Sequence, residues 1–270
     1  MIGDITIGQY LPGDSIIHKL DPRVKIILLI ACIVVLFVAN NLISFVFLIA
    51  VTLFYVWLTG IPFKLYIRGL KPLFIIICFT AVINLFTGSG EPLVSFWIFK
   101  ITSAGISNAV SMVVRIMLLV ITTTMLTYTT SPVVLTSGFE RLLSPLAKIK
   151  LPVHEFSMMI TIALRFIPTL LEETEKIINA QKARGADFES GGLIKRAKSL
   201  IPILIPLFVS AFRRADELAV AMECRCYTGG ENRTHFVKYN ICRRDILACV
   251  FVSLVLMSVI LINTFVPVLF

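Results

Sequence analysis

Two short segments of the chain place an arginine at the point where a long helical pattern ends. The first is Ala180-Gln181-Lys182-Ala183-Arg184-Gly185, and the second is Ala221-Met222-Glu223-Cys224-Arg225-Cys226-Tyr227. A guanidinium group is a planar fork of donors that can hold a carboxylate through two hydrogen bonds, which suits docking to an acidic partner. A structural reading of the first segment is also open, because glycine ends helices without strain and the helix dipole favours a cation in the last turn.

Residues for other chemistry are present without the partners that such chemistry requires. The chain lacks the phosphate loop G-x-x-x-x-G-K-[ST], so we expect it to hydrolyse no nucleotide by itself. A cluster of Cys224, Cys226, His235 and Cys242 lacks the paired spacing of a zinc site, and no metal is predicted. A membrane enzyme acting on a lipid or phosphate substrate is an alternative, because six basic residues could hold an anion: Arg165, Lys195, Arg196, Lys198, Arg213 and Arg214. No nucleophile, acid–base pair or metal set accompanies them.

The composition around these segments is typical of a membrane protein. Of the 270 residues, 57% are hydrophobic and 15% are charged, and the mean hydropathy is +0.93. A transmembrane helix needs roughly 20 mostly apolar residues. Stretches of this kind predict about five transmembrane helices, at residues 24–39, 42–58, 72–86, 106–129 and 246–269. The predicted fold is therefore an all-α integral membrane protein.

The distribution of positive charge predicts how these helices are oriented. Lys and Arg are enriched in short cytoplasmic loops. They precede the first predicted helix (Lys19, Arg23), follow the second (Lys64, Arg68) and precede the last as Arg243-Arg244. One arrangement fits all of these positions, with the N-terminus in the cytoplasm and the C-terminus outside. The net charge of +9 is then the usual bias of an inner membrane surface, and no nucleic-acid partner is predicted.

Most of the charge lies in one region between Glu140 and Asp245. This region holds seventeen of the 25 Lys and Arg residues and twelve of the 16 Asp and Glu residues. Its periodicity predicts a short amphipathic helix over 133–146, a helix over 154–184 kinked at Pro168, and a second long helical pattern over 193–225. We therefore predict three parts, which are listed in order: residues 1–131 with four transmembrane helices, 132–244 with the long cytoplasmic helices, and 245–270 with the last transmembrane helix.

Arg115 lies inside the fourth predicted transmembrane helix. A charged side chain at the centre of such a helix costs about 2.5–3.5 kcal/mol of insertion free energy. Two interpretations stay open: the side chain reaches the outer interface, or it forms a buried structural pair. A permease that binds its own substrate is another alternative for the whole chain, although few polar groups beyond Arg115, Asn84 and threonines are available to line a substrate path.

In its motifs the chain resembles the transmembrane T component of energy-coupling factor (ECF) transporters, a family that includes the cobalt-transport permease subunit. The resemblance covers nearly the whole chain. It rests on the two arginine segments and on five others, which are His18–Lys25, Gly69–Leu73, Thr130–Pro132, Leu142–Leu146 and Ala163–Pro168. These contain the structural family motif, Asp21-Pro22-Arg23 together with Arg165 and Pro168.

This resemblance implies a multi-pass protein of a prokaryotic cell membrane that links two ABC-type ATPase subunits to a substrate-binding membrane S component. The transporter would take up vitamins or other micronutrients. It implies that ATP and Mg are bound by the ATPase subunits and that this chain has no cofactor and no catalytic role. The long cytoplasmic helices would be coupling helices that transmit ATP-driven movement.

The resemblance also assigns a role to the two arginine segments, as tips of coupling helices that insert into grooves of the ATPases. The first tip, Ala183-Arg184-Gly185, matches the family motif without departure. The second is Cys224-Arg225-Cys226, which keeps the arginine and replaces both small neighbours. Cysteine at 226 adds a side chain where glycine would allow a positive φ angle. We expect the charge contact to survive, and the backbone geometry of the second tip is the open question.

Overall fold

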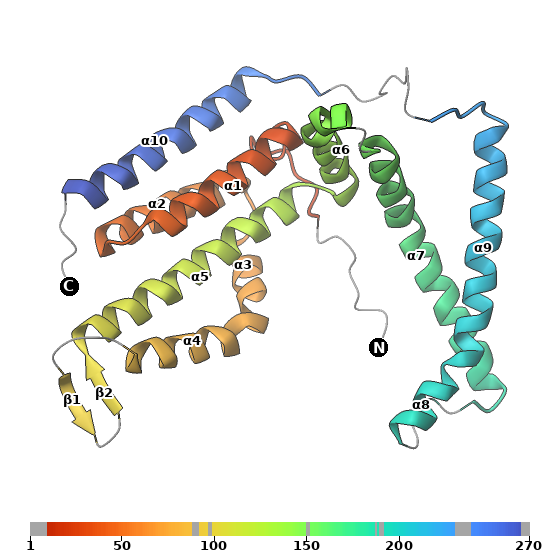
Figure 1. Ribbon diagram of the computed structural model, residues 1–270, viewed down its shortest axis with the longest axis horizontal. Helices are drawn as coiled ribbons and strands as arrows, with labels where there is room; N and C mark the ends of the chain where they lie inside the picture. Colours follow the sequence, from red (N-terminus) through yellow and green to blue (C-terminus); the bar gives the residue numbers. More distant parts are fainter. Residues whose placement is uncertain are drawn as a thin grey trace. The chain divides into compact units, whose positions relative to one another are not determined.

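Helices make up most of the protein in a computed structural model, which describes residues 10–87, 92–96, 99–149, 152–186, 188, 192–229 and 239–265. In chain order the α-helices are α1 (Pro22–Val38), α2 (Leu42–Thr59), α3 (Phe63–Leu70), α4 (Phe74–Phe86), α5 (Ser103–Thr129), α6 (Pro132–Leu143), α7 (Val153–Ala183), α8 (Leu193–Ser199), α9 (Ile201–Glu223) and α10 (Arg243–Phe265) (Figure 1). Short 3₁₀ helices stand at η1 (Lys71–Leu73) and η2 (Ser144–Ile149). The predicted all-α class is confirmed. An antiparallel hairpin of β1 (Pro92–Phe96) and β2 (Phe99–Thr102) was not predicted.

The chain divides into two units. The bundle unit comprises Gly8–Gly138 and Tyr239–Phe270, and the arm unit contains Phe139–Lys238. The bundle unit therefore holds α1 to α5 and α10, while the arm unit holds α7, α8 and α9. The boundary falls within α6. The three-part division made from the sequence stays a prediction.

Within the described residues, four stretches are long and apolar enough to cross a membrane: α2, the stretch Phe63–Phe86 that joins α3 and α4, α5 and α10. Each overlaps a predicted transmembrane helix. Helix α1 overlaps the remaining one, but it has 17 residues and is short for a span that needs roughly 20. The predicted end of the last helix, at Leu269, lies outside the described residues.

The stretch from α3 to α4 is bent. Figure 1 shows the chain changing direction at η1, between the two helices. Pro72 lies in η1, where its ring restricts the preceding residue and removes one backbone donor. The amphipathic helix α3 buries Tyr66, whose hydroxyl lies 3.1 Å from Oγ1 of Thr59 and whose ring meets Tyr128 edge-on. Proline therefore separates the amphipathic helix α3 from the apolar helix α4, and both helices pack against α5.

The helices of the arm unit differ from prediction at one point. Helix α7 has 31 residues and continues through Pro168, as predicted, without ending there. The single pattern predicted over 193–225 is wrong, because the structure contains two helices, α8 and α9, which are separated at Leu200. Pro202 occupies the first turn of α9. Proline is tolerated in a first turn but clashes with a preceding one, and this explains the break.

Polar side chains join both ends of α1 to neighbouring helices. At its N-terminal end, Lys25 Nζ donates to the carbonyl oxygen of Thr129 at the end of α5, at 3.0 Å. At its C-terminal end, Asn263 Nδ2 of α10 donates to the carbonyl oxygen of Val38 at 2.7 Å. Helix α5 therefore runs opposite to α1, and α10 runs in the same direction (Figure 1). These relative directions agree with those predicted from the positive charges.

Arg115 joins α5 to the C-terminal end of α1, and the reading that its side chain reaches the outer interface stays a prediction. Its Nη2 donates to the carbonyl oxygen of Ala39 at 2.7 Å, and its guanidinium carbon lies 5.5 Å from the ring centre of Phe45 and 5.8 Å from that of Phe37. The last carbonyl groups of a helix have no partner within the helix, and hydrocarbon offers no water to replace one. Arg115 thus caps α1 from α5 through a backbone carbonyl rather than an acidic side chain.

We predict that Asn263→Ala destabilises the bundle unit. Asn263 makes two hydrogen bonds, to Val38 and to Oγ of Ser44, and buried polar contacts between membrane helices contribute about 0.6–2 kcal/mol each. Thermal unfolding of the purified chain should therefore begin at a lower temperature. Thr264→Ala is the matched control, because Thr264 is exposed and bonds only to Ile260 of its own helix. Equal unfolding temperatures for the two variants would contradict the interpretation.

Candidate functional site

The first arginine tip is the C-terminal end of α7. The amide of Gly185 donates to the carbonyl of Lys182 at 3.0 Å, and the amide of Ala186 donates to that of Gln181 at 3.0 Å. Gly185 has φ +85°. These two bonds and the left-handed residue define a Schellman motif, the commonest glycine-dependent helix end. Arg184 is the C-cap residue, just before the turn.

The second arginine tip has the same geometry at the end of α9. The amide of Cys226 donates to the carbonyl of Glu223 at 2.8 Å, and the amide of Tyr227 donates to that of Met222 at 3.0 Å. Cys226 takes the left-handed position with φ +55°, and among the described residues it is the one non-glycine residue with positive φ. Arg225 precedes it, as Arg184 precedes Gly185. Cysteine therefore forms at this tip the same turn that Gly185 forms at the first, at the cost of local strain.

All six residues of the two tips are exposed: Ala183, Arg184, Gly185, Cys224, Arg225 and Cys226. Within the described part of the chain, neither Arg184 nor Arg225 uses its guanidinium in a hydrogen bond or ion pair. Each tip therefore presents a full set of donors to a partner. A helix end also carries partial negative charge, which favours the cation at that position.

Helices α7 and α9 run in opposite directions and contact each other through an ion pair (Figure 1). Nη2 of Arg214 donates to Oε2 of Glu173 at 2.9 Å, and both side chains are partly buried. A hydrogen bond from Ser210 lowers the pKa of Glu173, and the charge of the neighbouring Arg214 lowers it further. Desolvation acts in the opposite direction but is outweighed. The carboxylate is therefore held in its charged form.

The ion pair is equally distant from the two tips along the helices. Glu173 precedes Arg184 by eleven residues, and Arg214 precedes Arg225 by eleven. At a rise of 1.5 Å per residue, each arginine lies about 16 Å along its helix from the contact. The tips therefore extend on opposite sides of one crossing point.

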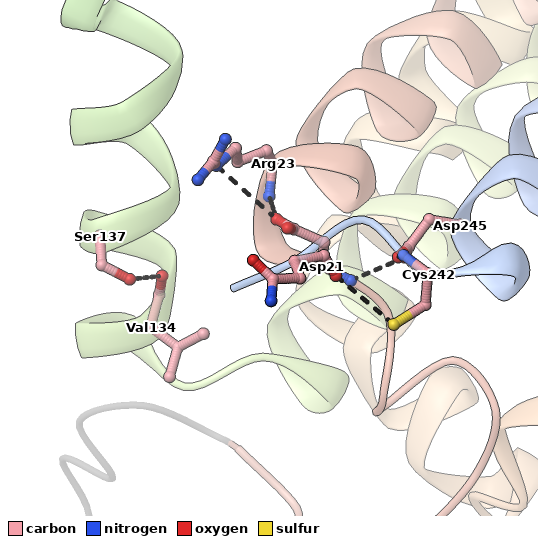
Figure 2. A network of polar contacts seen from close by, with 7 residues as sticks. Asp21, Arg23, Val134, Ser137, Cys242 and Asp245 are labelled. Carbon is pink, nitrogen blue, oxygen red and sulfur yellow. Dashed lines mark hydrogen bonds and ion pairs between the residues drawn. The ribbon is translucent and has the colours of Figure 1, made fainter. Parts of the chain in front are cut away.

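The motif Asp21-Pro22-Arg23 forms a helix start in the bundle unit. Oδ1 of Asp21 accepts from the amide of Arg23 at 2.9 Å, which is an N-cap, and Pro22 occupies the first helical position. Oδ1 of Asp245 accepts from the amide of Asp21 at 2.9 Å, and its Oδ2 accepts from the amide of Cys242 at 2.7 Å. Asp245 thus caps its own helix and fixes the start of α1 (Figure 2).

Lys25 completes this junction. Its Nζ donates to the carbonyls of His18 and Thr129 and to Oγ1 of Thr130, at 3.0–3.1 Å, so all three of its N–H groups are used. Lys25 is 7% exposed and Asp245 is 2% exposed. The sequence interpretation did not single out either residue. A lysine inside the first apolar run and an acid directly after Arg243-Arg244 were the available signals.

Helix α6 approaches this junction closely at Gly138. A Cβ atom at Gly138 would lie 3.0 Å from Cβ of Pro22 and 3.3 Å from Cδ1 of Ile26. Figure 2 shows Val134 and Ser137 of α6 on one side of the group formed by Asp21, Arg23, Cys242 and Asp245. Gly138 therefore allows two helices to pack at the start of α1.

The other members of the predicted family motif do not join this group. Arg165 and Pro168 are exposed on α7 in the arm unit, and Arg165 makes no hydrogen bond or ion pair to any described residue. Arg213 pairs with Glu217, one turn further along α9, at 3.1 Å. Among the described residues, no group of three or more His, Cys, Asp and Glu side chains could hold a metal ion. His235, one member of the cluster weighed for zinc, lies outside them.

Comparison with known proteins gives consistent matches over most of the chain. A family model described as "Cobalt transport protein" matches residues 13–236, which include both tips. The energy-coupling factor transporter transmembrane protein EcfT of Ruminiclostridium cellulolyticum is 53% identical over 247 residues, 92% of each chain. The proteins of the same name from Clostridium kluyveri and Bacillus subtilis are 53% identical over 250 residues and 45% identical over 262 residues. These alignments cover 92% and 97% of this chain and 93% and 98% of those relatives.

We predict opposite effects of exchanging glycine and cysteine at the two tips. Cys226→Gly removes a left-handed cysteine, whose strain of about 1–2 kcal/mol exceeds the 0.5–1 kcal/mol that glycine loses in chain entropy. Amide hydrogen exchange in residues 222–228 should therefore slow by roughly twofold to fivefold. Gly185→Cys should accelerate exchange at the end of α7 by a similar factor, because it introduces the same strain at a left-handed position. No atom lies near enough to obstruct the added side chain, so backbone strain is the expected cause of the change. Equal or reversed changes would contradict the strain assigned to Cys226.

Proposed function

Because the chain belongs to the family of energy-coupling factor transporter transmembrane proteins, we propose that it joins two ABC-type ATPase subunits to a membrane S component that binds the substrate. The family assignment rests on the match over residues 13–236 and on relatives of 45–53% identity. The chain is a multi-pass membrane protein and a non-catalytic subunit of its transporter. ATP and Mg are bound by the ATPases, and the transported substrate is a vitamin or another micronutrient held by the S component.

The observation that carries this proposal is the equivalence of the two tips. Each tip ends a long helix in a Schellman motif, and each places an exposed arginine directly before the left-handed residue of that motif. Two equivalent cationic ends suit a partner with two equivalent acidic grooves, which a pair of similar ATPase subunits would offer. Arg184 and Arg225 each bind a carboxylate in one groove, and the cytoplasm contains both tips and the N-terminus.

Coupling requires the tips to move with the ATPases. Nucleotide binding changes the separation of the two grooves, and the contacts must differ between the nucleotide states for any work to be transmitted. Helices α7 and α9 carry the motion because they are continuous helices of 31 and 23 residues, respectively. The ion pair between Glu173 and Arg214 keeps the helices in contact where they cross.

The two alternatives are disfavoured by particular contacts. Of the basic residues that could hold a lipid or phosphate substrate, Arg213 is paired with Glu217 and Arg214 with Glu173. A permease that binds its own substrate needs a polar path. The cavity inside the bundle unit is instead lined mostly by Leu, Val and Ile side chains, with few polar groups.

Charge reversal at the tips should prevent assembly. Hydrogen bonds to charged groups contribute about 1.5–3 kcal/mol, so Arg184→Glu or Arg225→Glu should weaken retention of the ATPase subunits by at least about tenfold. The measurement is the amount of ATPase that co-purifies with the tagged chain. Lys198→Glu, a reversal at an exposed residue of α8 that belongs to neither tip, is the control. Full assembly and uptake in the Arg184→Glu and Arg225→Glu variants would show that the tips have another role.

A charge exchange tests the crossing point separately. Arg214→Glu places two acids together and should reduce substrate uptake by the complete transporter, whereas Glu173→Arg combined with Arg214→Glu should restore much of it. The pair Arg213 and Glu217 is the control, because its side chains are 80% and 64% exposed and such pairs contribute little. If the double exchange at Glu173 and Arg214 restored nothing, the contact would not hold the helices as proposed.

A further inference from the structure

The bundle unit contains an apolar cavity of about 100 Å³ that is partly open to its surroundings. Helices α1, α2, α5 and α10 all contribute to its wall. Helix α1 packs against α5 and α10, and α2 packs against α5, so the cavity lies within this group of four helices. Nothing in the coupling role of the tips uses this space.

The cavity is long and narrow. On α1 its lining extends from Lys25 to Leu36, eleven residues, or about 16 Å along the helix. A water-sized site takes about 10–15 Å³, so 100 Å³ has room for roughly seven to ten groups of that size. A methylene group is similar in size to a water molecule. The length and the volume together fit a single extended alkyl chain and exclude a bulky ligand.

The two ends of the cavity differ in polarity. The end at Leu36 is lined by Leu48 and Val255, and all three are buried hydrophobic residues. The other end contains Lys25, Thr129 and Tyr55. Such a gradient matches an amphiphile that lies parallel to the helices with its polar group at the Lys25 end.

Ordered water does not suit this space. A buried water molecule needs two to four polar partners. The hydroxyls of Thr52, Thr122 and Thr129 donate to carbonyls of their own helices, and Lys25 has used its three N–H groups. The hydroxyl of Tyr55 is buried without a partner among the described residues. The Tyr55 hydroxyl can bond to the polar group of an amphiphile, whereas a column of water would lack partners along the Leu, Val and Ile side chains that form most of the wall.

We propose that this cavity binds one alkyl chain of a membrane amphiphile, either a phospholipid or a free fatty acid, with the polar group toward Tyr55 and Lys25. The bilayer supplies such chains at high concentration on every side of the bundle. Helices α2 and α10 share the least contact of the neighbouring helices around the cavity, so the chain enters between them. Aromatic rings line this entrance, since Phe251 lies 5.6 Å from Tyr55 and 6.0 Å from Phe54 between ring centres. A bound chain fills the void that would otherwise weaken the packing of the four helices.

Native mass spectrometry of the full chain tests this proposal. The chain is released from nanodiscs of palmitoyl-oleoyl phosphatidylglycerol, with and without added palmitic acid, and the bound mass is recorded. Val255→Phe fills the cavity, and since each buried methylene contributes roughly fourfold to affinity, we expect at least about a tenfold loss of the bound chain. Leu254→Phe is the matched control, because its neighbouring position is 59% exposed on the outer face of α10.

A second pair of variants tests whether any loss of the bound chain results from misfolding rather than from filling of the cavity. Cys32→Phe enters the cavity from α1, and Val34→Phe adds the same ring to the exposed face of that helix. A phospholipid mass that is lost in the filled variants supports binding of a lipid chain, and a palmitate mass with the same behaviour supports a free fatty acid. The proposal is overturned if wild type retains neither, or if the filled variants and their controls retain equal amounts while their helix content and unfolding temperatures are unchanged.

Discussion

The bundle depends on one constraint, that the polar backbone groups at both ends of α1 must find partners inside a membrane protein. Asp245 and Asp21 satisfy the first amides, while Arg115 and Asn263 satisfy the last carbonyls. Asp21 belongs to the start of α1 itself, whereas Arg115 comes from α5 and Asp245 and Asn263 come from α10, and both helices pack against α1. The end groups of this 17-residue helix are therefore paired within the protein, as a membrane interior requires.

Features that depend on local sequence were predictable. Composition and apolar length gave the all-α membrane class, and each of the four span-forming stretches overlaps a predicted helix. Pro22 and Asp21 indicate a helix start from neighbouring residues alone. The break at Leu200 was missed because Pro202 and Pro206 were both placed inside one helix, whereas Pro168 is tolerated within α7. Which proline ends a helix depends on packing that a single sequence does not contain.

Contacts between distant residues were not predictable. Lys25 meets Thr129, Asp21 meets Asp245, and Glu173 meets Arg214 across separations of 41 to 224 residues. The sequence left open whether the second tip, with cysteine at position 226, could form the same backbone turn as the first. The structure shows that it does. The Schellman hydrogen bonds hold Cys226 in a left-handed conformation that glycine would adopt more easily. The feature preserved in both tips is therefore a hydrogen-bonded turn with an arginine before it, and glycine is one way to build that turn.

The equal spacing of Glu173 and Arg214 from their tips has a mechanical consequence. The crossing point acts as a fulcrum, and α7 and α9 extend from it as lever arms of the same length. In the docking proposed above, equal forces at the two arginines act at equal distances from this contact and produce equal turning moments about it. Any asymmetry between the two docking positions would then arise from the strength of binding at each end.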